Sequence, residues 1–335
     1  MSGLLVLKPG LHTTVQDLGR FGLQAYGVPV SGALDPEALR LANALVGNAP
    51  DEAALEVLHA GPTLEITAPA LRVALAAHDG ELVIENAARR VLPPWQAAVL
   101  PRGTRLRVVA SRAAVCAYLA VGGGFDVKLV AGSRATYVRG GFGGWQGRAL
   151  TVGDELPAPR LALPPGRLRR LAVPPDPGVG PLRVVLGPQD DYFTAEAIAT
   201  LAGADFMVTR AADRMGLRFD GPKLAHRGGH DIVSDGTAAG ALQVPGDGRP
   251  LLLLADRQTT GGYPKIATVC TADMPRAGRL RPGDRVRFAV IDVAAAQAAR
   301  RAQEAALAMV IAELAGGDAA SGGGALLGRR HLIGA

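Results

Sequence analysis

Short apolar runs separated by turn residues dominate the chain, a pattern typical of β structure. Between residues 54 and 121 the runs ALEVL, LRVALA, ELVIE, RLRVVA and VCAYLAV are broken by turns that contain Gly or Pro. These breaks come too often to leave room for helices between strands, so we expect an antiparallel barrel or sandwich. A second β region begins at Leu182 and continues through GALQV, PLLLLA, IATVC and RVRFAV.

Three segments carry helix signals instead. Asp35 precedes Pro36, and Gly47 follows an apolar stretch, which predicts a capped helix between them. Thr194 is expected to cap a short helix that reaches Leu201. After Asp292 the chain becomes Ala-rich up to Gly316, which predicts a C-terminal helix.

These elements predict a mainly β protein of two domains, with a few short helices and a C-terminal helix; the family resemblance described below implies that both domains are β-barrels. The expected limits are 1–156 for an N-terminal barrel domain with an early helix, 157–181 for a Pro-rich linker, 182–291 for a C-terminal barrel domain, 292–316 for the C-terminal helix and 317–335 for a flexible tail. A chain of 335 residues is long enough for two such domains.

The stretch from Leu251 to Val269 holds the densest group of candidate functional residues. An apolar run to Ala255 is typical of a buried strand, and a second strand is expected from Ile266 to Cys270. The segment between them is then a polar loop, the kind of segment that often carries binding groups on a rigid sheet. The alternative is a surface turn in which Asp256 and Arg257 pair with each other.

Similar polar loops follow other strands. They contain Gln16, Asp17 and Arg20; Asp213 and Arg214; Ser234 and Asp235; and Gln243. Arginine can bind a carboxylate or phosphate through two hydrogen bonds, and Ser, Thr and Asp can position a small polar substrate or transfer a proton. Taken one at a time, internal ion pairs that order the loops remain an equally simple interpretation.

Composition narrows the functions that these loops can serve. The net charge of +6 comes from arginines spread along the chain without interleaved aromatic residues, so no nucleic-acid binding is expected. No run has the length of a membrane span and the N-terminus lacks a signal-peptide pattern, so we expect no membrane association and a cytoplasmic location. Cys116 and Cys270 lie in apolar runs and are expected to be buried thiols.

Neither a metal site nor a nucleotide loop is expected. Glycines between His226 and His230 prevent a helix from presenting both rings on one face. The G-x-x-x-x-G-K-[ST] and G-x-S-x-G motifs are absent from the sequence. Any ATP chemistry therefore uses an unrecognised site or belongs to a partner.

In combination, the motifs resemble a known family. HTTVQDLGRFG, GVPVSGALDPEALRLANALVGN, LAVGGGFDV, GSRATYVRGGFGG, DRMGLRF, SDGTAAGALQVPGDGRPLLLLADRQTTGGYPKIATV and PGDRVRF occur in order between about Leu5 and Phe288. This series resembles the biotin-dependent carboxyltransferase-type family, which includes the C subunit of bacterial 5-oxoprolinase, the antagonist of the sporulation-kinase inhibitor, and the allophanate-hydrolase-subunit-2-like domain of urea carboxylase. Arg279 and Ala135 depart from residues common in relatives.

The resemblance implies cyclophilin-like barrels and a heteromeric enzyme. It implies the C component of an ATP-dependent hydrolase, 5-oxoprolinase, that opens the ring of 5-oxo-L-proline to give L-glutamate. The implied partners are the B component, which is allophanate-hydrolase-subunit-1-like, and the A component. ATP is expected to be used by the complex rather than by this chain alone. Two alternatives are carboxyl transfer from biotin to urea or another amide, and non-enzymatic binding of a B-type kinase inhibitor.

Within that framework the loop residues receive expected roles. Catalytic roles are expected for Asp256, Thr259, Thr260, Tyr263 and Lys265. Substrate binding is expected for Arg257, Asp213, Arg214, Ser234, Asp235, Gln243, Gln16, Asp17 and Arg20. Arg257 or Arg214 is expected to hold the substrate carboxylate, while the catalytic group orients the lactam.

Overall fold

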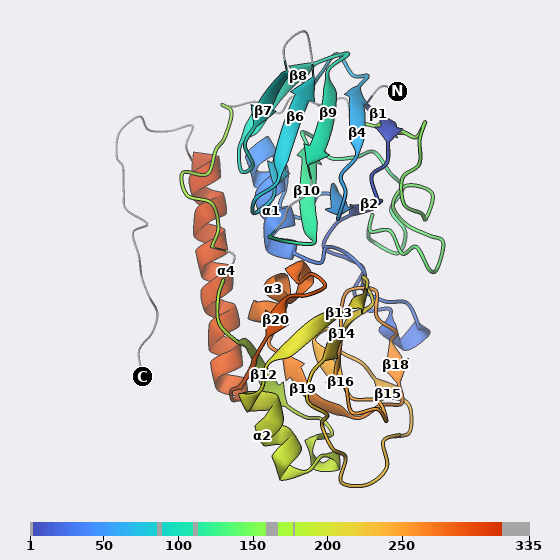
Figure 1. Ribbon diagram of the computed structural model, residues 1–335. Helices are drawn as coiled ribbons and strands as arrows, with labels where there is room; N and C mark the ends of the chain where they lie inside the picture. The colour runs from blue at the N-terminus through green and yellow to red at the C-terminus, as the bar shows by residue number, and fades with distance from the viewer. Residues whose placement is uncertain (1–2, 86–88, 110–112, 159–166, 177, 317–335) are drawn as a thin grey trace.

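The computed structural model describes residues 3–85, 89–109, 113–158, 167–176 and 178–316. Within them the chain forms an upper and a lower β domain in the view of Figure 1, with long helix α4 (Val293–Gly316) beside both. The expected tail 317–335 and the middle of the expected linker lie outside the described residues.

The N-terminal domain is built from a six-stranded and a five-stranded sheet. The first contains β11 (Glu155–Pro157), β1 (Gly3–Lys8), β4 (Thr63–Ile66), β9 (Arg105–Val109), β6 (Glu81–Glu85) and β7 (Arg89–Leu92). The second contains β2 (His12–Gln16), β3 (Ala54–Leu58), β10 (Cys116–Val121), β5 (Ala70–Ala76) and β8 (Ala97–Pro101). Every pairing in both sheets is antiparallel.

The five-stranded sheet is covered on both faces, which explains its nearly continuous apolar sequence. Successive side chains of a strand point to opposite faces, so Leu119 and Val121 of β10 pack with the six-stranded sheet. Tyr118 and Ala120 pack on the other face with helix α1 (Pro36–Val46). All six residues of β10 are therefore buried.

The C-terminal domain is a nearly closed barrel. Its eight-stranded sheet runs in the order β20, β13, β14, β17, β16, β19, β12 and β21. These strands span Arg285–Val286, Phe206–Ala212, Gly216–Asp220, Leu251–Leu253, Ala241–Gln243, Lys265–Val269, Leu182–Leu186 and Phe288–Val290. Because β20 and β21 flank Arg287 and form the two edges of the sheet, the last stretch of chain joins one edge to the other.

The expected helices form, and their caps explain their limits. The side chain of Asp35 accepts a hydrogen bond from the Ala38 amide at 3.0 Å, and Gly47 adopts the left-handed conformation that ends α1. Thr194 caps α2 (Ala195–Gly203) through Ala197 at 3.1 Å. Helix α4 begins after Asp292, whose side chain accepts from Ala295 at 2.7 Å.

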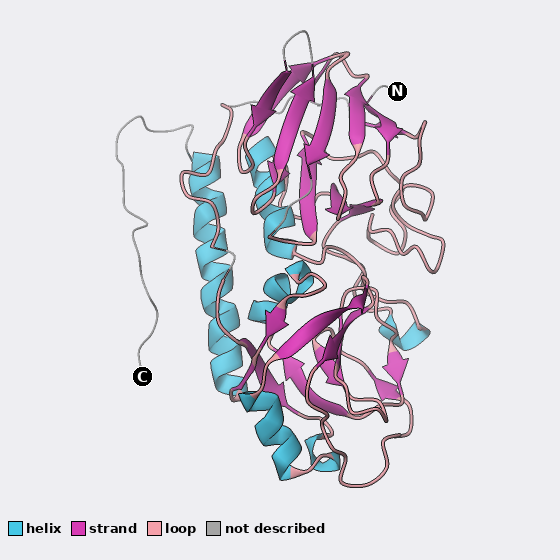
Figure 2. Ribbon diagram, viewed as in Figure 1, coloured by secondary structure: helices cyan, strands magenta, loops and turns pink. Residues whose placement is uncertain are grey.

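Short elements complete the fold. Helix α3 (Met274–Arg279), which the sequence pattern did not predict, follows β19 through the turn η3 (Thr271–Asp273), and the turns η1 (Gln24–Tyr26) and η2 (Asp190–Tyr192) lie in loops. A separate two-stranded sheet joins β15 (Asp235–Gly236) and β18 (Thr260–Gly261). The distribution in Figure 2 confirms the predicted class, mainly β with a barrel sheet, short helices and a C-terminal helix. No helix among the described residues is both long and apolar enough to cross a membrane.

Candidate functional site

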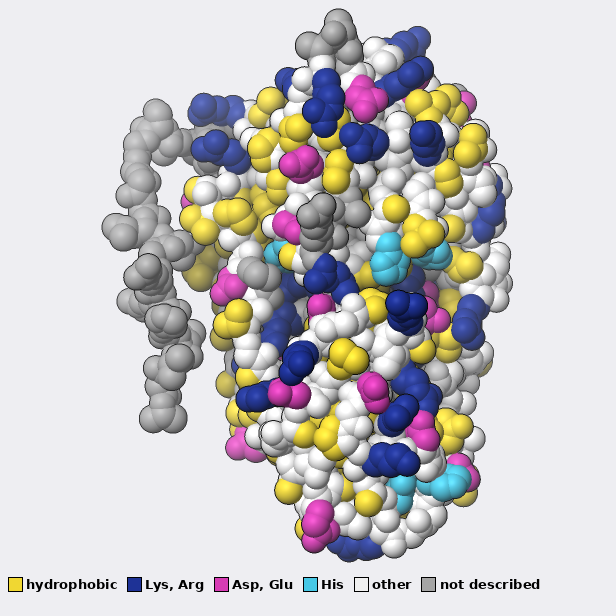
Figure 3. Space-filling model, in the orientation of Figure 1, with side chains coloured by type: hydrophobic (Ala, Val, Ile, Leu, Met, Phe, Trp, Pro, Cys, Tyr) yellow, Lys and Arg dark blue, Asp and Glu magenta, His cyan; other side chains and the backbone are white. Residues whose placement is uncertain are grey.

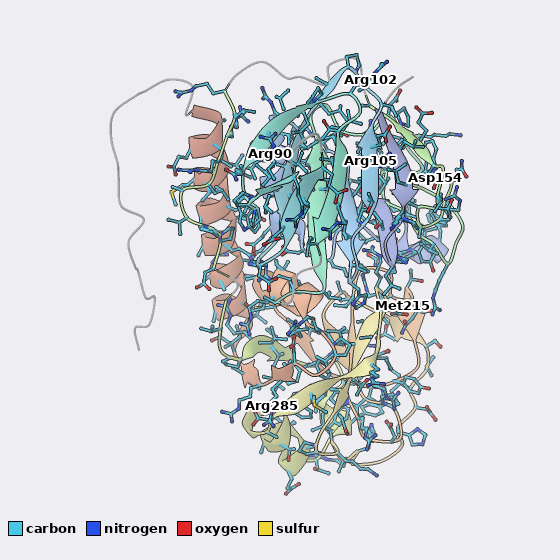
Figure 4. The ribbon with its side chains drawn as sticks, turned by 45° about the horizontal axis from the view of Figure 1, so that its top comes forward. Arg90, Arg102, Arg105, Asp154, Met215 and Arg285 are labelled. Carbon is cyan, nitrogen blue, oxygen red and sulfur yellow. The ribbon has the colours of Figure 1, made fainter. Side chains whose placement is uncertain are left out.

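The polar loops gather where the two domains meet, and their central feature is a buried ion pair network. Arg214, between β13 and β14, donates to Asp256 through Nε at 2.8 Å and Nη2 at 3.1 Å. Its Nη1 donates to Glu56 on β3 of the N-terminal domain, and its Nη2 to the Gly32 carbonyl oxygen at 2.6 Å. One guanidinium thus binds two carboxylates from different domains. Met215, the next residue, lies at the level of the domain junction in Figure 4.

The charged groups of the network are buried, and both carboxylates and the guanidinium form several hydrogen bonds. Glu56 also accepts from the Tyr118 hydroxyl at 2.6 Å and the Leu34 amide at 2.9 Å. Burial acts to lower the pKa of Arg214, but the charges of Glu56 and Asp256 outweigh burial and raise it. Burial, with the adjacent Glu56 carboxylate, raises the pKa of Tyr118. Arg214 and Asp256 therefore form a charged joint between the domains.

Asp256, Arg257 and Gln258 are consecutive but serve three different places. Asp256 binds Arg214 rather than Arg257, so the alternative of a turn closed by an Asp256–Arg257 pair is not what forms. Arg257 lines a groove between the domains. Gln258 lines a second groove, on the β13–β14 side, together with Asp213 and three arginines, Arg139, Arg210 and Arg218.

The end of the loop reaches a second charged pair. Lys265 at the start of β19 is only 2% exposed, and its Nζ lies 3.0 Å from Oδ2 of Asp235, whose side chain is half exposed. The hydrogen bond from Lys265 lowers the pKa of Asp235. Gln189 donates to the same carboxylate at 3.3 Å and accepts from the Lys265 amide at 3.1 Å. The buried ammonium group of Lys265 is therefore paired with a carboxylate that solvent can reach.

The remaining loop residues surround this pair. Thr260 and Gly261 pair with Gly236 and Asp235, which places β18 beside the acid. Gln243 accepts from Gln258 at 3.1 Å, and its buried Nε2 has no hydrogen-bond partner among the described residues. Ser234 and Tyr263 are exposed, whereas Thr259 is half-buried. These groups could contact a partner or a substrate from the outside of the barrel.

Three expected substrate-binding residues instead order a loop of the N-terminal domain. Asp17 accepts from the Ser133 hydroxyl at 2.6 Å and the Arg134 amide at 2.5 Å. Gln16 donates to the Thr136 carbonyl oxygen at 3.1 Å. Arg20 donates to the Ala135 carbonyl oxygen and lies over the Phe142 ring, 5.0 Å from its centre. These side chains therefore fix the glycine-rich stretch after residue 132 through hydrogen bonds.

Asp213 also binds its own loop, since it accepts from the Met215 and Gly216 amides at 2.7 and 3.2 Å.

Sequence reasoning missed Glu56 and Ser31, which both reach the domain junction. The available signal was a single acid inside the apolar run ALEVL, and a serine at a turn between Val30 and Gly32. Cys116 and Cys270 are buried free thiols, as expected. The described part of the chain contains no group of three or more metal-ligating side chains.

Basic side chains do not collect into one surface patch on the face drawn in Figure 3. Lys and Arg are spread over both domains with acidic side chains between them. Many form exposed ion pairs, such as Arg287 with Asp205 at 2.5 Å and Arg249 with Asp220 at 3.5 Å. The arginine-rich composition therefore contributes mainly local pairs.

A barrel joined through a buried ionic network to a two-sheet domain, with polar loops at the junction, defines a two-subdomain carboxyltransferase-type fold. Residues 26–290 match the family model described as carboxyltransferase domain, subdomain A and B, and the chain belongs to this family.

Relatives of this chain fall into two groups. It is 33% identical over 309 residues to the 5-oxoprolinase C subunit of Escherichia coli, covering 90% of this chain and 95% of that protein. The crystal structure of TTHA0988 is similar with a TM-score of 0.77 and 38% identity, covering 86% of this chain and 56% of that one. The K. lactis urea amidolyase structure has a TM-score of 0.83 and 29% identity, covering 92% of this chain but 20% of that one.

Proposed function

We propose that this chain is the C component of a heteromeric, ATP-dependent 5-oxoprolinase that opens 5-oxo-L-proline to L-glutamate. The observation that carries the proposal is the extent of the match. The chain covers 95% of the Escherichia coli protein, whereas it covers only 20% of the K. lactis urea amidolyase chain. A match over nearly the whole of the Escherichia coli protein supports the C-component assignment more directly than a match to about 20% of the urea amidolyase chain.

The arrangement at the domain junction is compatible with lactam chemistry. Ring opening of an amide requires a held substrate, a polarised carbonyl group and a group that moves protons. Arg257 is the better candidate for the substrate carboxylate, because the guanidinium of Arg214 is already bonded to Asp256 and Glu56. Asp256 then contributes indirectly, because its ion pair with Arg214 fixes the position of the loop that carries the other expected catalytic residues.

The outer part of the loop does not line the groove at Arg257, and its roles in proton transfer and orientation are proposed for the assembled complex. Lys265 and Asp235 form a charged pair that a substrate can reach from the half-exposed acid. Thr259, Thr260 and Tyr263 lie on the same loop, and Tyr263 is 41% exposed. Docking of the B component on this side would enclose them, in keeping with an active site shared between the components. ATP is a substrate of the complex, and we assign no step of its use to this chain.

The test is reconstitution with omission of each component. Purified A and B components are combined with this chain, 5-oxo-L-proline and ATP, and glutamate is measured with each protein left out in turn. Strict dependence on this chain is expected. Equal glutamate formation without it, or none with all three, would refute the proposal.

The alternative activities have their own readouts in the same experiment. Carboxyl transfer predicts consumption of ATP only when a biotin carboxylase, a biotin carrier and bicarbonate are supplied with urea or another amide. Regulation without turnover predicts a stable complex with the B component and no product under any of these conditions. The TM-score of 0.83 to urea amidolyase is the observation that favours carboxyl transfer as the second candidate.

A further inference from the structure

A groove of about 430 Å³ lies between the domains and has an apolar lining with one charged wall. It is bordered by the loop before α1, by α1 itself, by the segment after β17, and by α3 and α4. Its apolar lining includes Leu18, Val30, Ala33, Leu254, Ala255 and Met274. A groove of this size suits a small ligand with a compact apolar body.

Arg257 on this wall is a buried cation without a counter-charge. It is 4% exposed, and it donates to the carbonyl oxygens of Thr237 and Leu254, both at 3.3 Å. Among the described residues no carboxylate forms an ion pair with it, in contrast to Arg214. Burial lowers the pKa of Arg257. Burying an unpaired charge costs free energy, which indicates that a bound anion pairs with the Arg257 guanidinium.

Ser31 supplies a second unused polar group in the same groove. It is 4% exposed, and its hydroxyl has no hydrogen-bond partner in the described part of the chain. The Ser31 amide donates to the Ala255 carbonyl oxygen at 3.1 Å, which fixes it beside the Arg257 loop. Its backbone has φ of 56°, an uncommon conformation for a residue other than glycine. A serine with a free hydroxyl and an uncommon backbone conformation therefore lines the same groove as the unpaired guanidinium.

The other charged side chains of the groove already interact with one another. Arg40 and Arg300 share Glu304 as their counter-charge. Glu37 also lines the groove, and burial, with the nearby Asp35, raises its pKa. Arg257 is therefore the cation of the groove that lacks a carboxylate partner among the described residues, and a ligand with one carboxylate can direct it there.

We propose that Arg257 and Ser31 form a carboxylate-binding subsite for a small monocarboxylate with a compact apolar body, the class that contains 5-oxo-L-proline. The identity of the ligand rests on the proposed function, while the subsite itself rests on the geometry. The mostly apolar lining makes the substrate, whose only charge is one carboxylate, a better ligand than L-glutamate, which would also bury a second carboxylate and an ammonium group.

The first experiment measures binding to the full chain by calorimetry and by ligand-induced thermal shift. The probes are 5-oxo-L-proline, 2-pyrrolidinone, which has the same ring without the carboxylate, and L-glutamate. The variants are Arg257→Gln and Ser31→Ala, with Arg287→Gln as the control because Arg287 is an exposed arginine of the same domain paired with Asp205. We expect 5-oxo-L-proline to bind at least about tenfold more tightly than either other probe, because 2-pyrrolidinone lacks the charged hydrogen bond and L-glutamate would bury two further charged groups in an apolar groove.

Arg257→Gln should weaken 5-oxo-L-proline binding by about tenfold to a hundredfold, and Ser31→Ala by about threefold to tenfold. Arg287→Gln should leave it unchanged. Because Arg257 carries an uncompensated charge, Arg257→Gln should also keep or raise the unfolding temperature without ligand, so loss of binding cannot be attributed to misfolding. Equal binding of 2-pyrrolidinone, or unchanged binding by Arg257→Gln, would overturn the subsite.

A second measurement separates this inference from the proposed function. In the reconstituted complex, Arg257→Gln should raise the KM for 5-oxo-L-proline at least about tenfold. An unchanged KM in an active complex refutes the subsite and leaves the function standing. Conversely, binding of other small monocarboxylates through Arg257, with no glutamate formed by any complex, supports the subsite and refutes the function. If the free chain binds nothing, the KM comparison in the complex decides.

Discussion

Replacing Arg214 by Met tests whether the buried network joins the domains. The change keeps much of the side-chain length but leaves Glu56 and Asp256 without their shared cation, and both carboxylates are buried. Removing one partner of a buried ion pair costs about 3–5 kcal/mol. The Gly32 carbonyl oxygen also loses its donor, at about 1 kcal/mol. We therefore expect Arg214→Met to lower the free energy of unfolding by about 4–6 kcal/mol.

Urea unfolding at neutral pH measures this change with two probes. Tryptophan fluorescence reports on the N-terminal domain, since both tryptophans, Trp95 and Trp145, belong to it, and far-UV circular dichroism reports on both domains. The control is Arg287→Met, which breaks an exposed pair and should leave the midpoint of urea unfolding nearly unchanged. The two transitions should coincide in the unaltered protein and separate in Arg214→Met, because the domains lose their joint.

Should Arg214→Met fail to fold, Glu56→Gln gives a milder version of the same test. It retains the two bonds between Arg214 and Asp256 and removes only the charge contributed by the N-terminal domain. A cost of about 1–3 kcal/mol is expected. Losses no larger than that of Arg287→Met, with coincident transitions in both variants, would refute the role of the network.

Two further predictions concern charge and pH. Asp235→Asn removes the carboxylate that pairs with buried Lys265 and should lower the midpoint of urea unfolding; Lys265→Met should remove most of that loss in the double variant. For His12, burial, together with nearby Arg214, lowers the pKa, so the unfolded chain takes up its proton at a higher pH than the folded protein. Neutral His12 therefore imposes no penalty on the folded state above its unfolded pKa of 6.5, and the free energy of unfolding falls as the pH drops below that value. In urea titrations between pH 7.5 and 5.5, His12→Gln should show a smaller loss of stability than the unaltered protein.

Local signals in the sequence account for the elements that could be predicted. Asp35 and Gly47 set the ends of α1 through hydrogen bonds within a few residues, so their spacing alone is informative. The same holds for Asp292 at the start of α4. The strand from Leu251 is shorter in the structure than its apolar run, because Leu254 and Ala255 turn into the domain junction.

The junction itself depends on contacts that no local pattern encodes. Arg214 meets Glu56 across 158 residues of sequence and Asp256 across 42. From sequence alone Glu56 is one acid in a β run, and its role follows only from the packing of β3 against the C-terminal barrel. Ser31 was similarly hidden, since its unused hydroxyl is a property of the folded groove. The functional roles of the polar loops stay predictions, while the division of their residues between the domain junction, the groove and the barrel surface required the structure.

The loop after β17 connects the buried ion pair network to the groove between the domains. Asp256 is fixed to the joint by two hydrogen bonds, and the adjacent Arg257 faces the groove that the two domains form together. Consecutive Cα atoms are about 3.8 Å apart, so a shift of the joint cannot leave Arg257 in place. Ser31 reaches the same loop from the N-terminal domain through its bond to Ala255. The proposed carboxylate subsite therefore takes residues from both domains, and any partner that contacts both domains would change its geometry.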